Sequence, residues 1–213
     1  MHIGLSDSDT ASRAKNVSFD LGAIERLVPW FAILSASSWL IALITISLFF
    51  AIGQPWGTIN DVASFVQWAA AIPLVIAIYQ SQRAQPPIAL LVAVLGLVAL
   101  IVACGLTVLL LAHVLTFQQQ GTPTAVVGGV FGLWLVLAAA LWLGGSPLPG
   151  PLLALMAVAG TGTIAGVVGF VGFGSSHWLT YAGGAVGGLA YPAWGYWLGI
   201  LLLRSPDLLT RSH

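Results

Sequence analysis

The sequence predicts an all-α integral membrane protein with six transmembrane helices, and three observations carry that prediction. Of 213 residues, 59% are hydrophobic and 6% are charged, and the mean hydropathy is +1.01. A soluble domain is roughly one quarter charged, yet Asp61 and Arg83 are the only formally charged residues between Arg26 and Arg204. That interval divides into apolar stretches of about the 20 residues that a helix needs to cross a bilayer.

The spans are separated by clusters of Gly, Pro, Gln and Ser, which favour turns. The predicted spans are residues 28–53, 59–80, 88–114, 124–144, 152–174 and 178–203, and the breaks between them include 53–55, 83–87, 118–121, 144–151 and 174–176. Residues 1–27 and 204–213 are then tails flanking one membrane domain, 28–203. Residues 18–30 mix apolar and charged side chains at roughly helical spacing, which predicts either an interfacial helix or a solvated tail.

All basic residues fall on one side of this threading, which predicts the orientation. With six spans, both tails share a side with the break at 83–87. That side carries every Lys and Arg of the chain, at positions 13, 15, 26, 83, 204 and 211. The positive-inside rule makes it cytoplasmic. The N-terminus lacks the pattern of a cleaved signal peptide, and with the short loops this favours the inner membrane of a prokaryote.

The third and fifth spans resemble each other at a fixed offset of 64 residues. The matches are Pro87 with Pro151, Gly96 with Gly160, Gly105 with Gly169 and His113 with His177. They predict repeated two-helix hairpins, which would share one orientation and be related by an axis along the membrane normal. The alternative is helix chemistry shared by chance.

The ionisable side chains that suggest chemistry are Asp61, His113 and His177, all predicted at outer helix ends. Two imidazoles and a carboxylate could bind a divalent metal, two histidines could hold haem axially, and a carboxylate with a histidine could pass protons. The alternative is structural, because a carboxylate such as Asp61 at the start of a helix is favoured by the helix dipole.

Other polar and helix-breaking residues are weaker candidates. Trp56 and Asn60 lie in the turn before the second span and Gln67 lies within it, where each could contact a ligand or serve packing. Pro73 and Pro192 predict kinks in the second and sixth spans. No charge is predicted at the bilayer centre, which argues against ion-coupled transport.

Glycines at three- and four-residue spacing predict close helix packing in the second half of the chain. They include Gly128, Gly132, Gly166, Gly169, Gly172, Gly184 and Gly188. Packing within the protein is the favoured interpretation. Oligomerisation, or the close approach of a flat pigment or quinone, are alternatives.

The sequence carries no catalytic or phosphate-binding motif, so a non-enzymatic protein is predicted, and no cofactor is specified. Net charge is zero, which argues against nucleic acid as a partner. The leading hypothesis is a structural or accessory subunit, with the lipid bilayer and other membrane subunits or further copies of itself as partners. Alternatives are a small permease or channel for a neutral or lipophilic solute, and a haem- or metal-binding redox or sensor protein.

Overall fold

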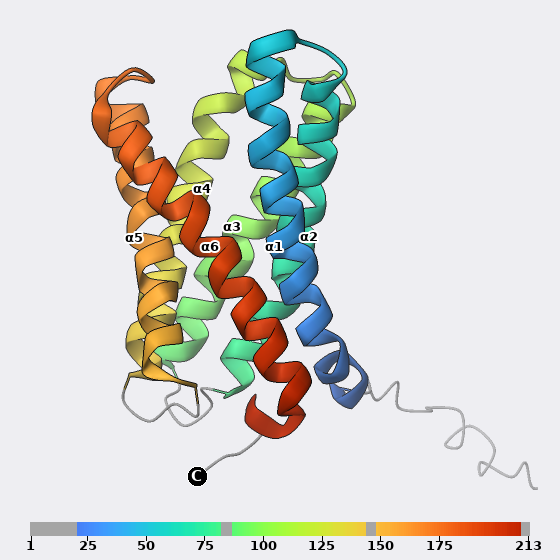
Figure 1. Ribbon diagram of the computed structural model, residues 1–213, viewed down its shortest axis with the longest axis vertical. Helices are drawn as coiled ribbons and strands as arrows, with labels where there is room; N and C mark the ends of the chain where they lie inside the picture. Colours follow the sequence, from blue (N-terminus) through green and yellow to red (C-terminus); the bar gives the residue numbers. More distant parts are fainter. Residues whose placement is uncertain (1–20, 82–86, 144–147, 210–213) are drawn as a thin grey trace, which may run out of the picture.

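The computed structural model describes residues 21–81, 87–143 and 148–209, and these residues form an all-helical bundle (Figure 1). The elements are α1 (Leu21–Ile52), α2 (Trp56–Ser81), α3 (Ile88–Leu111), α4 (Phe117–Trp142), α5 (Gly150–Phe173), α6 (Trp178–Arg204) and the short 3-10 helix η2 (Pro206–Leu209). Residues 18–20 of the predicted interfacial segment lie outside the described residues, and Leu21 onward belongs to α1.

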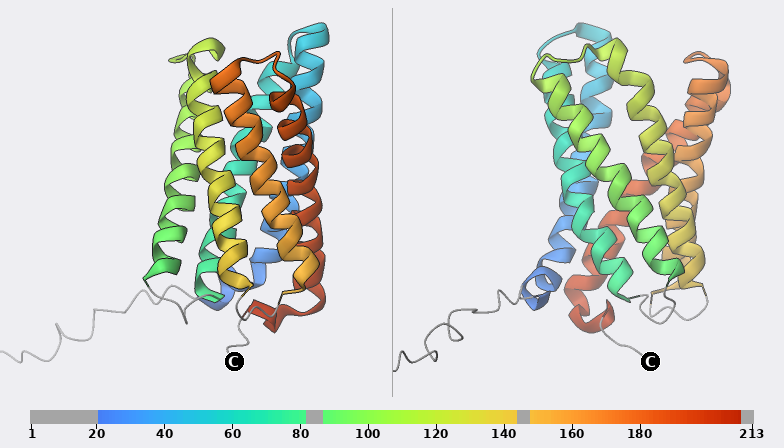
Figure 2. Two further views of the ribbon diagram at one scale, coloured as in Figure 1. Left: turned by 90° about the vertical axis from the view of Figure 1, so that its left-hand side faces the viewer. Right: turned by 180° about the vertical axis from the view of Figure 1, so that it is seen from behind.

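The helices form a ring in which each packs against the helix before it and the helix after it, and α6 returns to α1. Consecutive helices are antiparallel (Figure 2). The connections α1–α2, α3–α4 and α5–α6 therefore lie at one end, called here the loop end. The opposite end, where α1 begins and α6 ends, is called the terminal end.

The surface of the bundle is apolar, as a bilayer requires. Leu91, Ile101 and Leu189 are among many large apolar side chains that are exposed, whereas the interior is rich in alanine, glycine and aromatic rings. All six long helices are apolar enough and long enough to cross a membrane. In lipid, apolar side chains gain little by burial, so small residues that permit close packing dominate helix contacts. Six such helices support an integral membrane protein.

The Gln-rich stretch 118–121, predicted as a break, is helical, and that prediction is wrong. The backbone N–H of Gln119 donates to Thr116 Oγ1 at 3.3 Å, and the N–H of Thr116 donates to Gln119 Oε1 at 2.9 Å. This reciprocal capping box satisfies two N–H groups at the start of α4. The helix therefore begins at Phe117, seven residues before the predicted start.

Helices α5 and α6 pack backbone against backbone through glycines. A Cβ atom added to Gly187 would lie 2.6 Å from the Thr163 nitrogen, and one added to Gly166 would lie 2.9 Å from the Gly184 nitrogen. A Cβ added to Gly183 would collide with the Gly166 backbone. Only glycine permits such an approach, so these two helices are interlocked.

The glycines predicted to pack fall into two groups. Gly132 meets the Gly160 carbonyl of α5, Gly166 meets α6, and Gly169 meets the backbone of Thr180. By contrast, Gly128, Gly172 and Gly184 have no atom within 4 Å of an added Cβ, and Gly188 has only side-chain atoms of Leu43 and Trp39, at 3.8 and 4.0 Å. Glycine spacing therefore identified the packed helices more accurately than the packed positions.

The contacts of the matched positions do not show the predicted repeat. Gly96 of α3 meets the Trp134 ring of α4, and Gly160 of α5 also meets α4, where a hairpin repeat would place it against α6. Likewise, Thr116 caps α4, whereas its match, Thr180, lies inside α6. The repeat stays a prediction from sequence.

Candidate functional site

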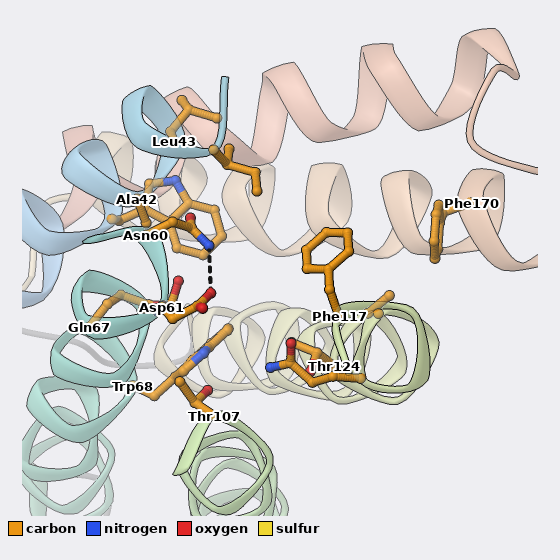
Figure 3. A pocket seen from close by; sticks show the side chains of 16 residues that line it. Ala42, Leu43, Asn60, Asp61, Gln67, Trp68, Thr107, Phe117, Thr124 and Phe170 are labelled. Atoms are coloured by element: carbon orange, nitrogen blue, oxygen red, sulfur yellow. Dashed lines mark hydrogen bonds between the residues drawn. The ribbon is translucent and has the colours of Figure 1, made fainter. Parts of the chain in front are cut away.

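A cavity of about 400 Å³ lies toward the loop end of the bundle (Figure 3). One wall comes from α2, which contributes Asn60, Asp61, Ser64, Gln67 and Trp68. These positions recur at intervals of three and four residues, so they share one face of the helix. That face carries most of the polar side chains in the first half of the helix.

The opposite wall comes chiefly from α4, through Phe117, Gln120 and Thr124, with Thr107 added by α3. In Figure 3, Phe117 and Thr124 lie across the space from the α2 side chains. The Thr107 hydroxyl donates to the Ala103 carbonyl at 2.9 Å. Its oxygen is consequently left as an acceptor.

Helices α1 and α5 complete the lining with mostly apolar side chains. Trp39, Leu43 and Ile46 come from α1, and Phe170 comes from α5. The loop ends of α5 and α6 stand apart from those of α1 and α2 (Figure 1). Phe170 marks the far side of the cavity, toward the α5–α6 pair.

An aromatic layer adjoins the cavity through Trp39 and Trp68, which line it. It comprises Trp39, Trp68, Phe131, Trp134, Tyr191 and Trp194, contributed by α1, α2, α4 and α6. Ring centroids of Trp68 and Phe131 are 5.7 Å apart, and those of Phe131 and Tyr191 are 5.8 Å apart, both pairs edge to face. Edge-to-face contacts at this separation are favourable for aromatic pairs.

Directly within this layer, a hydrogen-bonded junction joins three helices. The Ser35 hydroxyl donates to the backbone carbonyl of Gln67 at 3.1 Å, and its oxygen lies 2.6 Å from the Tyr191 hydroxyl oxygen. A hydroxyl has one hydrogen to donate, so Tyr191 donates to Ser35. The junction links α1, α2 and α6 immediately beneath the cavity.

Two residues of the cavity lining each carry a buried polar side-chain atom without a hydrogen-bond partner. The Gln67 side chain is 1% exposed, and its Nε2 makes no hydrogen bond among the described residues. It lies close to the Tyr191 hydroxyl without reaching hydrogen-bond geometry. The Thr124 Oγ1 is unpartnered in the same way. A buried polar group without a partner costs about 1–3 kcal/mol, so each invites a ligand or a water as its missing partner.

Asp61 is half-buried at the upper part of the cavity. One of its oxygens accepts a hydrogen bond from Asn60 Nδ2 at 3.2 Å. The prediction that Asp61 lies at the start of a helix is wrong, because α2 begins at Trp56 and places Asp61 in the second turn. Gln54 serves the start of the helix instead, accepting from the Thr58 N–H at 3.4 Å.

A smaller outer pocket of about 210 Å³ adjoins the cavity at the loop end. Ile46, Asn60, Asp61 and Phe117 line both spaces, while His113 lines only the outer pocket. Asp61 therefore stands where the two spaces meet. His113 lies just beyond α3 at a positive φ of 57° and is exposed.

His177 is placed elsewhere, as the N-cap of α6. Its Nδ1 accepts from the Leu179 N–H at 3.3 Å, and its ring stacks on Phe173 at 4.7 Å. Among the described residues, no three His, Cys, Asp or Glu side chains are grouped closely enough to hold a metal. The described residues thus do not bring Asp61, His113 and His177 together as a metal site, and neither the cavity nor the outer pocket is lined by both histidines.

The remaining sequence candidates divide between the cavity and the helix interiors. Asn60 and Gln67 line the cavity, whereas Trp56 is half-buried at the first position of α2. Pro73 and Pro192 lie inside α2 and α6, which continue as helices through them. Sequence reasoning missed most of the lining residues, among them Trp39, Ser64, Gln120 and Thr124. The helical spacing of Asp61, Ser64, Gln67 and Trp68 was the signal that would have revealed the α2 wall.

Searches for related proteins found no matching family model, no matching curated protein and no matching solved structure.

Proposed function

We propose that this protein is a small membrane permease that binds a small solute in the loop-end cavity. The observation that carries the proposal is a cavity within an apolar helical bundle whose walls hold buried, unpartnered polar atoms. Its volume of about 400 Å³ falls within the range of about 300–1,000 Å³ common for small-molecule sites. Mostly apolar walls with a few convergent polar groups are also typical of such sites.

The aromatic layer beside the cavity supports carriage rather than a continuous channel. The space adjoins the outer pocket at the loop end, with which it shares four lining residues, and Trp39 and Trp68 of the aromatic layer line it. A carrier that exposes its site to one side at a time has this form. Transport would then require the aromatic layer to part while the loop end closes.

The direct test fills the cavity. Ala125 of α4 lines it, and Val126, the next residue, is exposed on the surface. We expect Ala125→Trp to abolish solute binding and flux in reconstituted vesicles, because the indole occupies the site. Val126→Trp adds the same side chain on the outer face and should leave both unchanged. Equal flux of a panel of small solutes through both variants and through empty vesicles would argue against a permease.

We further propose that the loop end faces the outside of a prokaryotic inner membrane. Arg26 and Arg204 lie at the terminal end, in agreement with the positive-inside rule. In a Cys104→Ser background, an impermeant maleimide applied to intact cells should label Ser176→Cys at the loop end. It should label Ser205→Cys at the terminal end only after lysis. The reverse pattern would overturn the orientation.

The accessory-subunit role predicted from the glycine content is a second candidate. Gly172 and Gly184 are exposed with open space above them, and small residues on a helix face admit a neighbouring helix. Blue-native electrophoresis in mild detergent is expected to show an oligomer or a complex. A clean monomer from which crosslinking recovers no partner would count against this role.

A further inference from the structure

We propose that the solute of the loop-end cavity is a small organic cation with an apolar body and a hydrogen-bond acceptor at its far end. This inference rests on the proposed binding function and specifies the chemistry of the ligand. Four features of the cavity support it: its charge, its aromatic lining, the position of an unpartnered hydrogen-bond donor and the small number of metal-binding side chains.

The charge of the site favours a cation. Asp61 contributes a carboxylate at the meeting point of the two spaces, and no Lys or Arg among the described residues lines either of them. The only hydrogen bond to Asp61 within the described part of the chain is the neutral one from Asn60. In surroundings of low dielectric, a carboxylate without a counter-ion attracts positive charge strongly and repels anions.

Aromatic rings line the same space. Trp39, Trp68 and Phe117 contribute to the cavity wall, and Phe117 also lines the outer pocket. An ammonium group near the face of such a ring is attracted by its quadrupole, most strongly by tryptophan. The rings also supply the apolar contact that an alkyl-substituted ammonium requires.

An unpartnered donor lies deeper along the same helix. Gln67 Nε2 is buried and unpartnered, and it lies six residues beyond Asp61 on α2. At 1.5 Å per residue this is about 9 Å deeper along the helix. A ligand with its cation at Asp61 would present an acceptor oxygen to Gln67 across a body of a few carbon atoms.

A metal ion fits these features less well. A hard cation such as Ca²⁺ takes about six to eight oxygen ligands, and the described residues hold no group of His, Cys, Asp and Glu suited to a metal. An amide N–H donor and aromatic walls would also be unused by a bare ion. An organic cation uses all of them.

The test compares ammonium ions with their neutral carbon isosteres on the full-length purified protein. One pair is acetylcholine and 3,3-dimethylbutyl acetate, which differ in the charged nitrogen, and longer-chain homologues form further pairs. Binding is followed by tryptophan fluorescence and by thermal shift in detergent. We expect the cation of at least one pair to bind about tenfold more tightly than its isostere, as a charge-assisted contact predicts.

Variants separate the two recognition elements. Asp61→Asn should remove the preference for the cation and leave binding of the neutral isostere unchanged, which also shows that the variant is folded. Asp207→Asn, in η2, removes the same charge at the terminal end and should change neither. Gln67→Met should weaken acetylcholine binding several-fold while sparing pentyltrimethylammonium, which has the cation but lacks the ester acceptor.

The outcomes distinguish this inference from the proposed function. Equal binding of both members of every pair overturns the cation and leaves a solute-binding cavity. An equal effect of Asp61→Asn and Asp207→Asn also overturns it, because the charge would then act only at long range. If no cation of any pair binds, the cation proposal fails. If, in addition, no neutral solute shows flux sensitive to Ala125→Trp, the permease proposal fails with it.

Discussion

The α5–α6 pair and the α1–α2–α4 region share one apolar composition and differ in how closely their helices approach. Between α5 and α6, glycines from both helices meet, and a single added carbon at Gly183 would collide with the Gly166 backbone. At the loop ends of α1, α2 and α4, the helices instead leave a cavity of about 400 Å³ with polar walls. In the first region the helix backbones are in direct contact, and in the second the helices stay apart.

The difference shows how stability and binding are divided within the bundle. Close backbone contact maximises the packing that holds helices together in lipid, so the interlocked pair stabilises the fold. The cavity region forgoes such contacts and buries Gln67 and Thr124 without partners. Sites that must receive a ligand commonly carry such a cost to stability.

The largest expected effect is in the interlocked pair. Gly183→Ala should destabilise the protein by about 3 kcal/mol, because the methyl group forces α6 away from α5. Unfolding in mixed detergent micelles, followed by circular dichroism, measures the change. Gly184→Ala is the matched control, since its added carbon meets open space. A similar loss in both variants would mean that backbone contact is not what distinguishes the pair.

A smaller effect of opposite sign is expected at the cavity floor. Gln67→Met keeps the side-chain length and removes the unpartnered amide, so stability should rise by about 1 kcal/mol while ligand binding weakens. The same unfolding assay checks the gain. Gln118→Met, at an exposed position of α4, should leave stability near that of the parent. A loss of stability in Gln67→Met would show that the Gln67 amide is partnered in the protein.

The last comparison concerns two glycines one turn apart on α4, and the smallest single effect is expected at Gly128. A Cβ at Gly128 meets nothing within 4 Å, whereas one at Gly132 lies 2.9 Å from the Gly160 carbonyl. Gly128→Ala should raise stability by roughly 0.5–1 kcal/mol through reduced backbone entropy. Gly132→Ala should lower it by about 1 kcal/mol or more. Thermal shift of both variants, measured together, tests whether α4 marks the boundary between the regions.

Much of the fold could be predicted from the sequence, because helix length and apolar composition are imposed by the bilayer. Six predicted spans correspond to six helices. The start of α4 was missed because glutamines and a glycine were taken as turn formers, whereas Thr116 and Gln119 form a cap. The choice depended on a reciprocal pair of hydrogen bonds, and composition does not reveal such a pair.

The candidate site was predicted only in part. Asp61, Asn60 and Gln67 stood out because polar residues are scarce in the spans. The lining residues on other helices did not stand out, because Trp39 and Thr124 can be recognised as part of the cavity only once α1 and α4 are placed around α2. The shared site of His113 and His177 stays a prediction, and it depends on the placement of the helix ends in the same way. The arrangement of the six helices around the bundle decides which helix ends are neighbours. The sequence gives the order of the spans along the chain and not the distances between them in space.

The junction of Ser35, Gln67 and Tyr191 gives the two regions a mechanical connection. Gln67 lines the cavity, and its backbone carbonyl is hydrogen-bonded to Ser35, which is hydrogen-bonded in turn to the hydroxyl of Tyr191 on α6. Because α6 is packed backbone to backbone against α5, a displacement of Tyr191 would move both helices together. A solute that displaces Gln67 by binding its side-chain amide would therefore act on α5 and α6 through Ser35 and Tyr191.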